Sequence, residues 1–187
     1  MNLRSALLAY RPDCAQESAD LALMLRCLDA FPDVLSRDNP ICHFTASCWI
    51  VEPARRRVLM AHHNLYNAWA WIGGHADGES DLCAVALREA REETGLRELR
   101  LLREGIFSVQ VLAVQSHVKR GAFVSSHLHL DCCYLFEAEQ TQPLRSKEDE
   151  NSAVAWIEIS RVEETSGEAA MLPIYRKLNQ RLLCNQL

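Results

Sequence analysis

The sequence predicts an α/β protein, because segments with helical periodicity alternate with β-rich runs. The clearest helical segment is 81–94, which follows a glycine-rich loop at 73–80. Runs rich in β-forming residues occur at 43–51, 58–62, 105–114, 125–137 and 153–159. The 187 residues are 49% hydrophobic and 24% charged, which is ordinary for one globular domain with a sizeable core. We therefore expect one domain over 1–187, made of an N-terminal helical extension (1–40), a core (41–160) and a C-terminal helix (161–187).

Charge, cysteine content and hydropathy exclude several classes of function. The net charge of −5 argues against binding of a nucleic-acid backbone, although a local basic pocket for a small nucleotide is compatible with it. The eight cysteines form no Cys-x-x-Cys pair, which favours reduced thiols in a cytosolic protein. No apolar stretch approaches about 20 residues, and the N-terminus lacks the pattern of a signal peptide. We therefore expect a cytoplasmic protein that binds neither a membrane nor polymeric nucleic acid.

The segment 81–94 carries both start and stop signals of a helix. Ser80 or Asp81 can cap its first turn, and Gly95 stands where a left-handed residue ends a helix. At about 100° per residue, one side of this helix is apolar and another is acidic. The apolar stripe consists of Cys83, Leu87, Ala90 and Thr94, and the acidic side consists of Glu89, Glu92 and Glu93.

Three glutamates on one side of a helix repel each other by a few tenths of a kcal/mol per pair unless a cation neutralises them. Hard divalent ions such as Mg²⁺ bind carboxylate oxygens and often bridge to substrate phosphates. The cluster therefore favours a metal site, and a solvated acidic surface is the alternative. The glycine-rich loop that precedes the helix favours the metal site over a solvated surface, because backbone without side chains approaches phosphates and metals closely.

This loop and helix resemble the signature of the Nudix hydrolase family, Gly-x5-Glu-x7-Arg-Glu-U-x-Glu-Glu-x-Gly-U, where U is aliphatic. Residues 88–96 match its second half, and Gly74 lies at the right distance upstream. Two positions depart from the pattern. Ser80 stands where the first Glu belongs, with Glu79 one residue early, and Ile72 replaces a frequent Pro. The GGHADG loop and a His-x-His-x-Asp strand at 127–131 are similar to those of a bacterial subset of the family.

The resemblance implies a fold and a reaction. The fold is an α/β/α sandwich with a mixed, curved central sheet, here with an extra helix at each end. The reaction is hydrolysis of the diphosphate linkage of a nucleoside diphosphate joined to another moiety, through attack of water on phosphorus. The implied cofactor is Mg²⁺ or Mn²⁺. The implied metal ligands are the carbonyl of Gly73 and the carboxylates of Glu89, Glu92 and Glu93.

The same resemblance assigns roles in the reaction. Arg88 is expected to orient a helix carboxylate. The proton of the attacking water is expected to pass to Glu150, six residues before Trp156, or to one of the helix glutamates, Glu92 or Glu93. Glu148 is the alternative on the same acidic loop, which could also be merely solvated.

Histidines are concentrated in the loop and in one strand. His75 follows the double glycine and is expected to contact phosphate. In the run 125–137, alternation places His127, His129, Asp131 and Cys133 on one face, which we expect to form a polar wall of the substrate cleft. A zinc site made by His127, His129 and a cysteine is the alternative, but no second cluster completes a tetrahedral set. Two lesser candidates are His43, for which a structural role is favoured, and Lys119-Arg120, for which a solvated loop is favoured over phosphate contact.

Other functions remain open at this point. A Nudix-fold regulatory protein could bind a nucleotide without turnover, and an isomerase of the isopentenyl diphosphate type has a related fold. The partner expected in each case is a small molecule. The helix predicted at 14–31 is expected to pack on the core, with a dimer contact as the alternative, so the protein is expected to be a monomer or a homodimer.

Overall fold

The computed structural model describes residues 2–119 and 121–184, and of Lys119 it describes the backbone only. The helices are α1 (Leu3–Ala9), α2 (Ala15–Ala30), α3 (Leu82–Thr94), the 3-10 helix η1 (Ile159–Arg161), α4 (Val162–Ser166) and α5 (Leu172–Cys184). The strands are β1 (Cys42–Val51), β2 (Arg57–His63), β3 (Ala68–Ala70), β4 (Ile72–His75), β5 (Arg100–Leu101), β6 (Ser108–Val114), β7 (His117–Lys119), β8 (Ala122–Val124), β9 (His127–Glu137) and β10 (Asn151–Glu158). No helix among the described residues is long and apolar enough to cross a membrane.

A mixed sheet of eight strands organises the molecule. Its main path is β10-β2-β1-β9-β5, and β3, β4 and β6 pair with β2, β1 and β9. The central pair, β1 and β9, is parallel, whereas the other pairs are antiparallel. The register of the central pair places His43 opposite His129 and Thr45 opposite Asp131. The predicted α/β class with a mixed central sheet is therefore confirmed.

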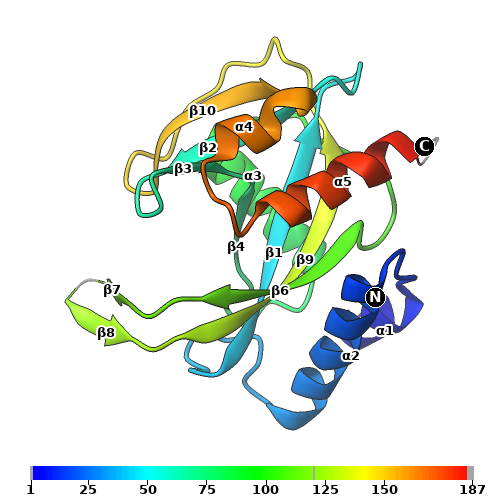
Figure 1. Cartoon of the computed structure of the whole chain (residues 1–187), viewed down its shortest axis with the longest axis vertical. Coiled ribbons are helices and arrows are strands. Elements are labelled where there is room, and N and C mark those ends of the chain that lie inside the picture. The colour runs from blue at the N-terminus through cyan, green and yellow to red at the C-terminus, as the bar shows by residue number, and fades with distance from the viewer. Residues whose placement is uncertain (1, 120, 185–187) are drawn as a thin grey trace.

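Helices cover both faces of this sheet, as Figure 1 shows: α5 crosses in front of β1 and β9, and α3 lies behind them. Alternate residues of β1 therefore enter two different cores. Phe44, Ala46 and Cys48 belong to the core beneath α3, whereas Trp49 packs with α5. Because both faces are covered, all ten residues of β1 are buried.

The N-terminal extension packs on the core, as expected for the predicted helix at 14–31. Met24 and Cys27 of α2 are buried in the core cluster beneath α3. The short α1, which the sequence analysis did not predict, adds Leu3 and Leu7 to the same cluster. A seven-residue helix depends on such tertiary contacts, because helices this short are marginal on their own.

A buried ion pair also connects α2 to α5. Glu17 has no exposed surface, and its carboxylate lies 3.0 Å from Nη1 of Arg181 and 3.2 Å from Nζ of Lys177. Burial alone would raise the pKa of Glu17, but hydrogen bonds from the Asp13 amide and from Tyr10 hold that pKa below its usual value. The carboxylate is therefore ionised near neutral pH and joins the two ends of the chain.

The segment 117–125, in which the sequence predicts a loop at 119–121, contains a small antiparallel hairpin, β7 and β8, which projects from the body of the molecule (Figure 1). Phe123 and Val118 are largely exposed on it. Arg120 lies outside the described residues, so the predicted contact of Lys119 and Arg120 with phosphate stays a prediction.

The prediction that one face of β9 forms a polar wall of the substrate cleft is wrong for its Asp131 and Cys133 positions. His127 and His129 are half-buried, but Asp131 is 2% exposed and Cys133 is fully buried. The reason is that α5 covers this face of the sheet, so Cys133 packs in the second core. Alternation identified the side chains that share a face, but it could not show that both faces are covered.

Candidate functional site

Local signals set the ends of α3, the helix that carries the predicted carboxylates. Oδ1 of Asp81 accepts a hydrogen bond from the Ala84 amide at 3.0 Å, which caps the first turn. Gly95 has a φ of 74° and ends the helix, and its amide donates to the Arg91 carbonyl at 3.0 Å. The helix predicted over 81–94 is therefore confirmed.

The buried side of α3 is broader than the predicted apolar stripe. Ala90 and Thr94 are fully buried as expected, whereas Cys83 and Leu87 are only partly buried. Residues on the neighbouring side are buried instead: Leu82, Val85 and Ala86. As a consequence, the three glutamates differ in exposure rather than forming one exposed acidic side.

The double glycine allows close packing around β4. A Cβ atom on Gly73 would lie 2.6 Å from the Ala46 carbonyl oxygen of the neighbouring strand. A Cβ atom on Gly74 would lie 2.5 Å from Cδ of Glu89 on α3. Only glycine leaves room for these approaches, so the backbone of β4 lies directly against the carboxylate of Glu89.

Glu93 is the most deeply buried of the three glutamates, at 5% exposed. Its carboxylate accepts hydrogen bonds from the Gly73 amide at 3.1 Å and from Nδ2 of Asn151 at 2.7 Å. Burial nevertheless raises the pKa of Glu93 to about 7, and the charges of Glu89 and Glu150 contribute to this rise. Asn151 stands at the start of β10 beside the predicted base, and no sequence pattern indicates it.

Glu89 and Glu92 extend the carboxylate group toward the surface. The side chain of Glu89 is 14% exposed, and burial raises its pKa although Arg88 donates to it at 3.1 Å. The side chain of Glu92 is 49% exposed and lies 4.0 Å from Nε of Arg88. Arg88 thus contacts one carboxylate and lies close to the other, as a residue that orients them would.

The acidic loop before β10 lies near this group. Glu150 is half-exposed, with its carboxylate 3.0 Å from Nζ of Lys147, and its backbone carbonyl accepts from the Asn64 amide at 2.9 Å. The carbonyl of Glu148 accepts from the Asn64 side chain at 3.0 Å. The structure therefore brings Gly73, Glu89, Glu93 and Glu150 to one region between α3, β4 and the start of β10.

The departure from the family pattern at Ser80 lies at the entrance to α3. Ser80 is exposed, and Oε1 of Glu79 accepts from the Asp81 amide at 2.9 Å. Just before it, Asp77 has a positive φ of 50° and forms an ion pair with Arg37, whose Nε lies 2.6 Å from Oδ1. Glu79 therefore supports the turn into the helix.

Four histidine rings meet on the opposite face of β4, β1 and β9. The ring of His43 lies 5.1 Å from that of His75 and 4.9 Å from those of His127 and His129, centroid to centroid. Burial lowers the pKa of His43, which favours its neutral form. The group of metal-binding side chains within 4.8 Å of one another consists of His43, His75 and His129, and it contains no cysteine. The expected zinc alternative with a cysteine therefore lacks support among the described residues, and His43 faces this cluster.

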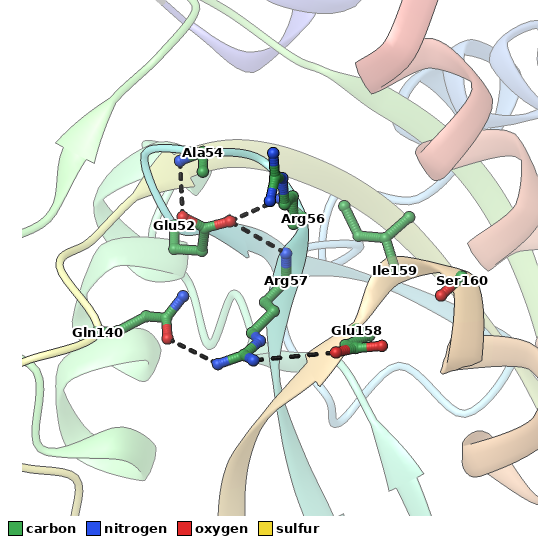
Figure 2. Close-up of a pocket in the computed structure, with 8 residues that line it drawn as sticks. All are labelled: Glu52, Ala54, Arg56, Arg57, Gln140, Glu158, Ile159 and Ser160. Atoms are coloured by element: carbon green, nitrogen blue, oxygen red, sulfur yellow. Dashed lines mark hydrogen bonds and ion pairs between the residues drawn. The ribbon is translucent and has the colours of Figure 1, made fainter.

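A surface groove of about 520 Å³ lies elsewhere (Figure 2). Its main charged groups have partners: backbone amides of the turn surround the Glu52 carboxylate, and Arg57 contacts Gln140 and Glu158. It adjoins the turn after Val51, whereas the candidate site lies along Thr45–Cys48 of the same strand. The groove is therefore separate from the carboxylates.

Comparison with known proteins gives matches in sequence and in fold. The human protein named nucleoside diphosphate-linked moiety X motif 6 is 30% identical over 86 residues, which are 44% of this chain and 25% of that protein. The match thus spans about a quarter of that relative.

Among solved structures, the Nudix hydrolase RenU from M. smegmatis has a TM-score of 0.58 at 16% identity, covering 78% of this chain and 88% of that one. The dihydroneopterin triphosphate pyrophosphohydrolase of E. coli has a TM-score of 0.54 at 13% identity, covering 74% and 92%. At these identities the likeness concerns the fold. The NUDIX domain model matches residues 43–178, well over half of the sequence, and the chain therefore belongs to the NUDIX domain family.

Proposed function

We propose that this protein is a Nudix pyrophosphohydrolase that uses Mg²⁺ or Mn²⁺ to cleave the diphosphate linkage of a nucleoside diphosphate joined to another moiety. The observation that carries the proposal is the carboxylate group of α3 against the glycine backbone of β4. Family membership and the name of the human relative support the reaction class.

The carboxylates fit a hard divalent ion. Burial raises the pKa values of Glu89 and Glu93, which means that their ionised forms lack sufficient compensating charge in the protein alone. A cation held by Glu89, Glu92 and Glu93, with the carbonyl of Gly73, would supply that charge. When bound, such an ion neutralises the diphosphate and lowers the pKa of water.

The surrounding residues have separate tasks in this proposal. Arg88 holds Glu89 in position through its 3.1 Å hydrogen bond. Asn151 and the Gly73 amide fix the Glu93 carboxylate. Glu150, half-exposed and near Glu93, accepts the proton of the attacking water, with Glu92 as the alternative base. Proton transfer of this kind typically contributes about 10²–10⁴ in rate.

The expected contact of His75, His127 and His129 with substrate phosphate stays a prediction and has no part in the proposed reaction, because these side chains lie on the face of the sheet opposite the carboxylates. These side chains are half-buried, so a ligand can reach them.

A substrate panel tests the proposed reaction. Nucleoside diphosphate conjugates are incubated with the protein and Mg²⁺ or Mn²⁺, and phosphate-containing products are measured. We expect turnover that chelator abolishes and that Glu92→Gln reduces. Glu98→Gln, which changes an exposed glutamate just beyond α3, is the matched control and should leave the rate unchanged.

The same panel distinguishes the two other functions. A conjugate that raises the melting temperature without being cleaved would replace the hydrolase with a nucleotide-binding protein. A diphosphate compound that is rearranged with its diphosphate intact would favour an isomerase.

A further inference from the structure

The histidine cluster arises from the register of three strands. β1 lies between β4 and β9, with His43 opposite His129 and Thr45 opposite His75. Residues two apart on a strand share a face, so His43 and Thr45 point to the same side of the sheet. The three imidazoles therefore come from three neighbouring strands that the sheet holds rigidly.

The three rings form a nearly equilateral triangle. Their centroids are separated by 5.1 Å (His43 to His75), 4.9 Å (His43 to His129) and 5.0 Å (His75 to His129). One ring nitrogen of each lies within 4.8 Å of the others. Two nitrogens bound to one tetrahedral zinc ion are roughly 3.4 Å apart, because each Zn–N bond is about 2.0–2.1 Å. Modest rotations of the half-buried His75 and His129 would close this difference.

His43 provides an independent indication of a ligand. It is 3% exposed, and its Nδ1 lies 3.2 Å from the Asn39 carbonyl. A carbonyl only accepts hydrogen bonds, so Nδ1 carries the proton and Nε2 keeps its lone pair. That Nε2 atom is buried and has no hydrogen-bond partner among the described residues. A buried acceptor without a partner is unfavourable, and a bound cation would satisfy it.

The contact of His43 with Asn39 is itself held in place. The side-chain oxygen of Asn39 accepts from the amides of Ile41 and Cys42 at 3.0 and 3.1 Å, and its Nδ2 donates to Asp33 at 2.8 Å. Histidines that bind metals commonly donate their other ring N–H to a backbone carbonyl in this way, which fixes the tautomer and the ring. The loop before β1 therefore holds His43 with its lone pair directed into the cluster.

We propose that His43, His75 and His129 bind one transition-metal ion of the zinc class. Imidazole nitrogens suit zinc and its neighbours, whereas Mg²⁺ prefers oxygen ligands. His127 lies at the rim, with its Nε2 atom 3.2 Å from that of His129. Three protein ligands leave a fourth position beside His127 open to water or to an oxygen of a ligand.

This site is distinct from the carboxylate group and does not depend on the proposed hydrolase activity. The Cβ direction of Gly74 points at Glu89 on the α3 face. The next residue, His75, points to the other face because side chains alternate along a strand. The oxygen ligands and the nitrogen ligands thus lie on opposite faces of β4, and each set can be removed without changing the other.

Zinc titration tests the proposal. The protein carries Cys14→Ser and Cys184→Ser, which remove the two exposed thiols that could bind zinc nonspecifically. After treatment with a chelator, zinc is titrated in competition with a chromogenic chelator. We expect one equivalent per chain, and an affinity about 100-fold or more lower in His75→Gln and in His129→Gln.

The matched control is His62→Gln, because His62 lies on β2 and pairs with Ser152 at 2.9 Å, outside the cluster. It should bind zinc as the parent does, and so should Glu92→Gln. Circular dichroism shows whether each variant is folded. His75 and His129 are chosen for substitution because they are half-buried, whereas replacing the buried His43 is more apt to disturb the fold. Equal zinc affinity in His75→Gln and the parent would overturn the proposal. The proposal would also be overturned if inorganic phosphate, but not zinc, stabilises the protein and His75→Gln abolishes that effect. The cluster would then be an anion contact.

Discussion

Glu93 shows how single residues of the candidate site depend on one another. Its carboxylate is buried and takes hydrogen bonds from Gly73 and Asn151, which belong to two different strands. The spacing within one helix predicted the three glutamates, because residues three and four apart are neighbours on a helix. No local pattern predicted Asn151, because its place beside Glu93 depends on the long-range pairing of β10 with β2.

Replacing Gly73 or Gly74 by alanine should affect stability and turnover differently. In Gly73→Ala the new methyl group would meet rigid backbone, the Ala46 carbonyl, so we expect a loss of stability of about 1–3 kcal/mol. In Gly74→Ala the methyl group would meet the Glu89 side chain, which can move, so stability should fall less while turnover falls sharply. Urea denaturation and rate measurements on both variants test this. Equal losses of stability would contradict it.

Asn151 makes a second prediction. Its side chain donates to Glu93 and favours the ionised carboxylate, so Asn151→Leu should raise the pKa of Glu93 above its value of about 7. A protonated carboxyl binds a divalent cation poorly. Mn²⁺ binding is measured by calorimetry as the pH is lowered from 9 to 6. Binding should begin to weaken at a higher pH in the variant than in the parent. Identical pH profiles would show that Asn151 does not act through Glu93.

At the scale of the element, prediction succeeded where the deciding contacts are local. The ends of α3 depend on Asp81 and Gly95, whose capping roles are visible in the sequence. The face of β9 was only partly predicted, because Asp131 lies in the interior. It accepts hydrogen bonds from Thr45, Ser47 and Gln110 on neighbouring strands, partners that alternation cannot reveal.

The connection between α2 and α5 makes a prediction about pH. Glu17→Gln would leave the buried charge of Arg181 without its main partner, and we expect a loss of about 3 kcal/mol at pH 7. Because the pKa of Glu17 is lower in the folded protein than in the unfolded chain, this stabilisation is complete above about pH 5. The stabilisation is lost as the pH falls through the pKa of Glu17 in the folded protein.

Urea denaturation at several pH values tests this connection. The parent should lose stability more steeply than Glu17→Gln on acidification below pH 5, so that the two curves converge. Curves that stay parallel would show that Glu17 does not titrate differently in the folded state.

At the scale of the whole molecule, the central sheet separates two kinds of side chain. Carboxylates lie toward α3, and histidines lie on the face covered in part by α5. The family and its mixed sheet were predictable, because the signature is contained in one loop and helix. The histidine cluster was only partly predictable, since the parallel register of β1 with β9 joins residues 86 positions apart, as in the contact of Thr45 with Asp131. From the sequence, His43 is only a lesser candidate for which a structural role is favoured.

The most direct test of the hydrolase proposal compares Glu93→Gln with Glu98→Gln. The change at Glu93 keeps the shape of the side chain but removes the charge from the centre of the carboxylate group. With the best conjugate of the panel and saturating Mg²⁺ or Mn²⁺, we expect the rate to fall about 100-fold or more in Glu93→Gln and to stay unchanged in Glu98→Gln. Full turnover by a folded Glu93→Gln variant would contradict the central claim that this carboxylate group performs the reaction.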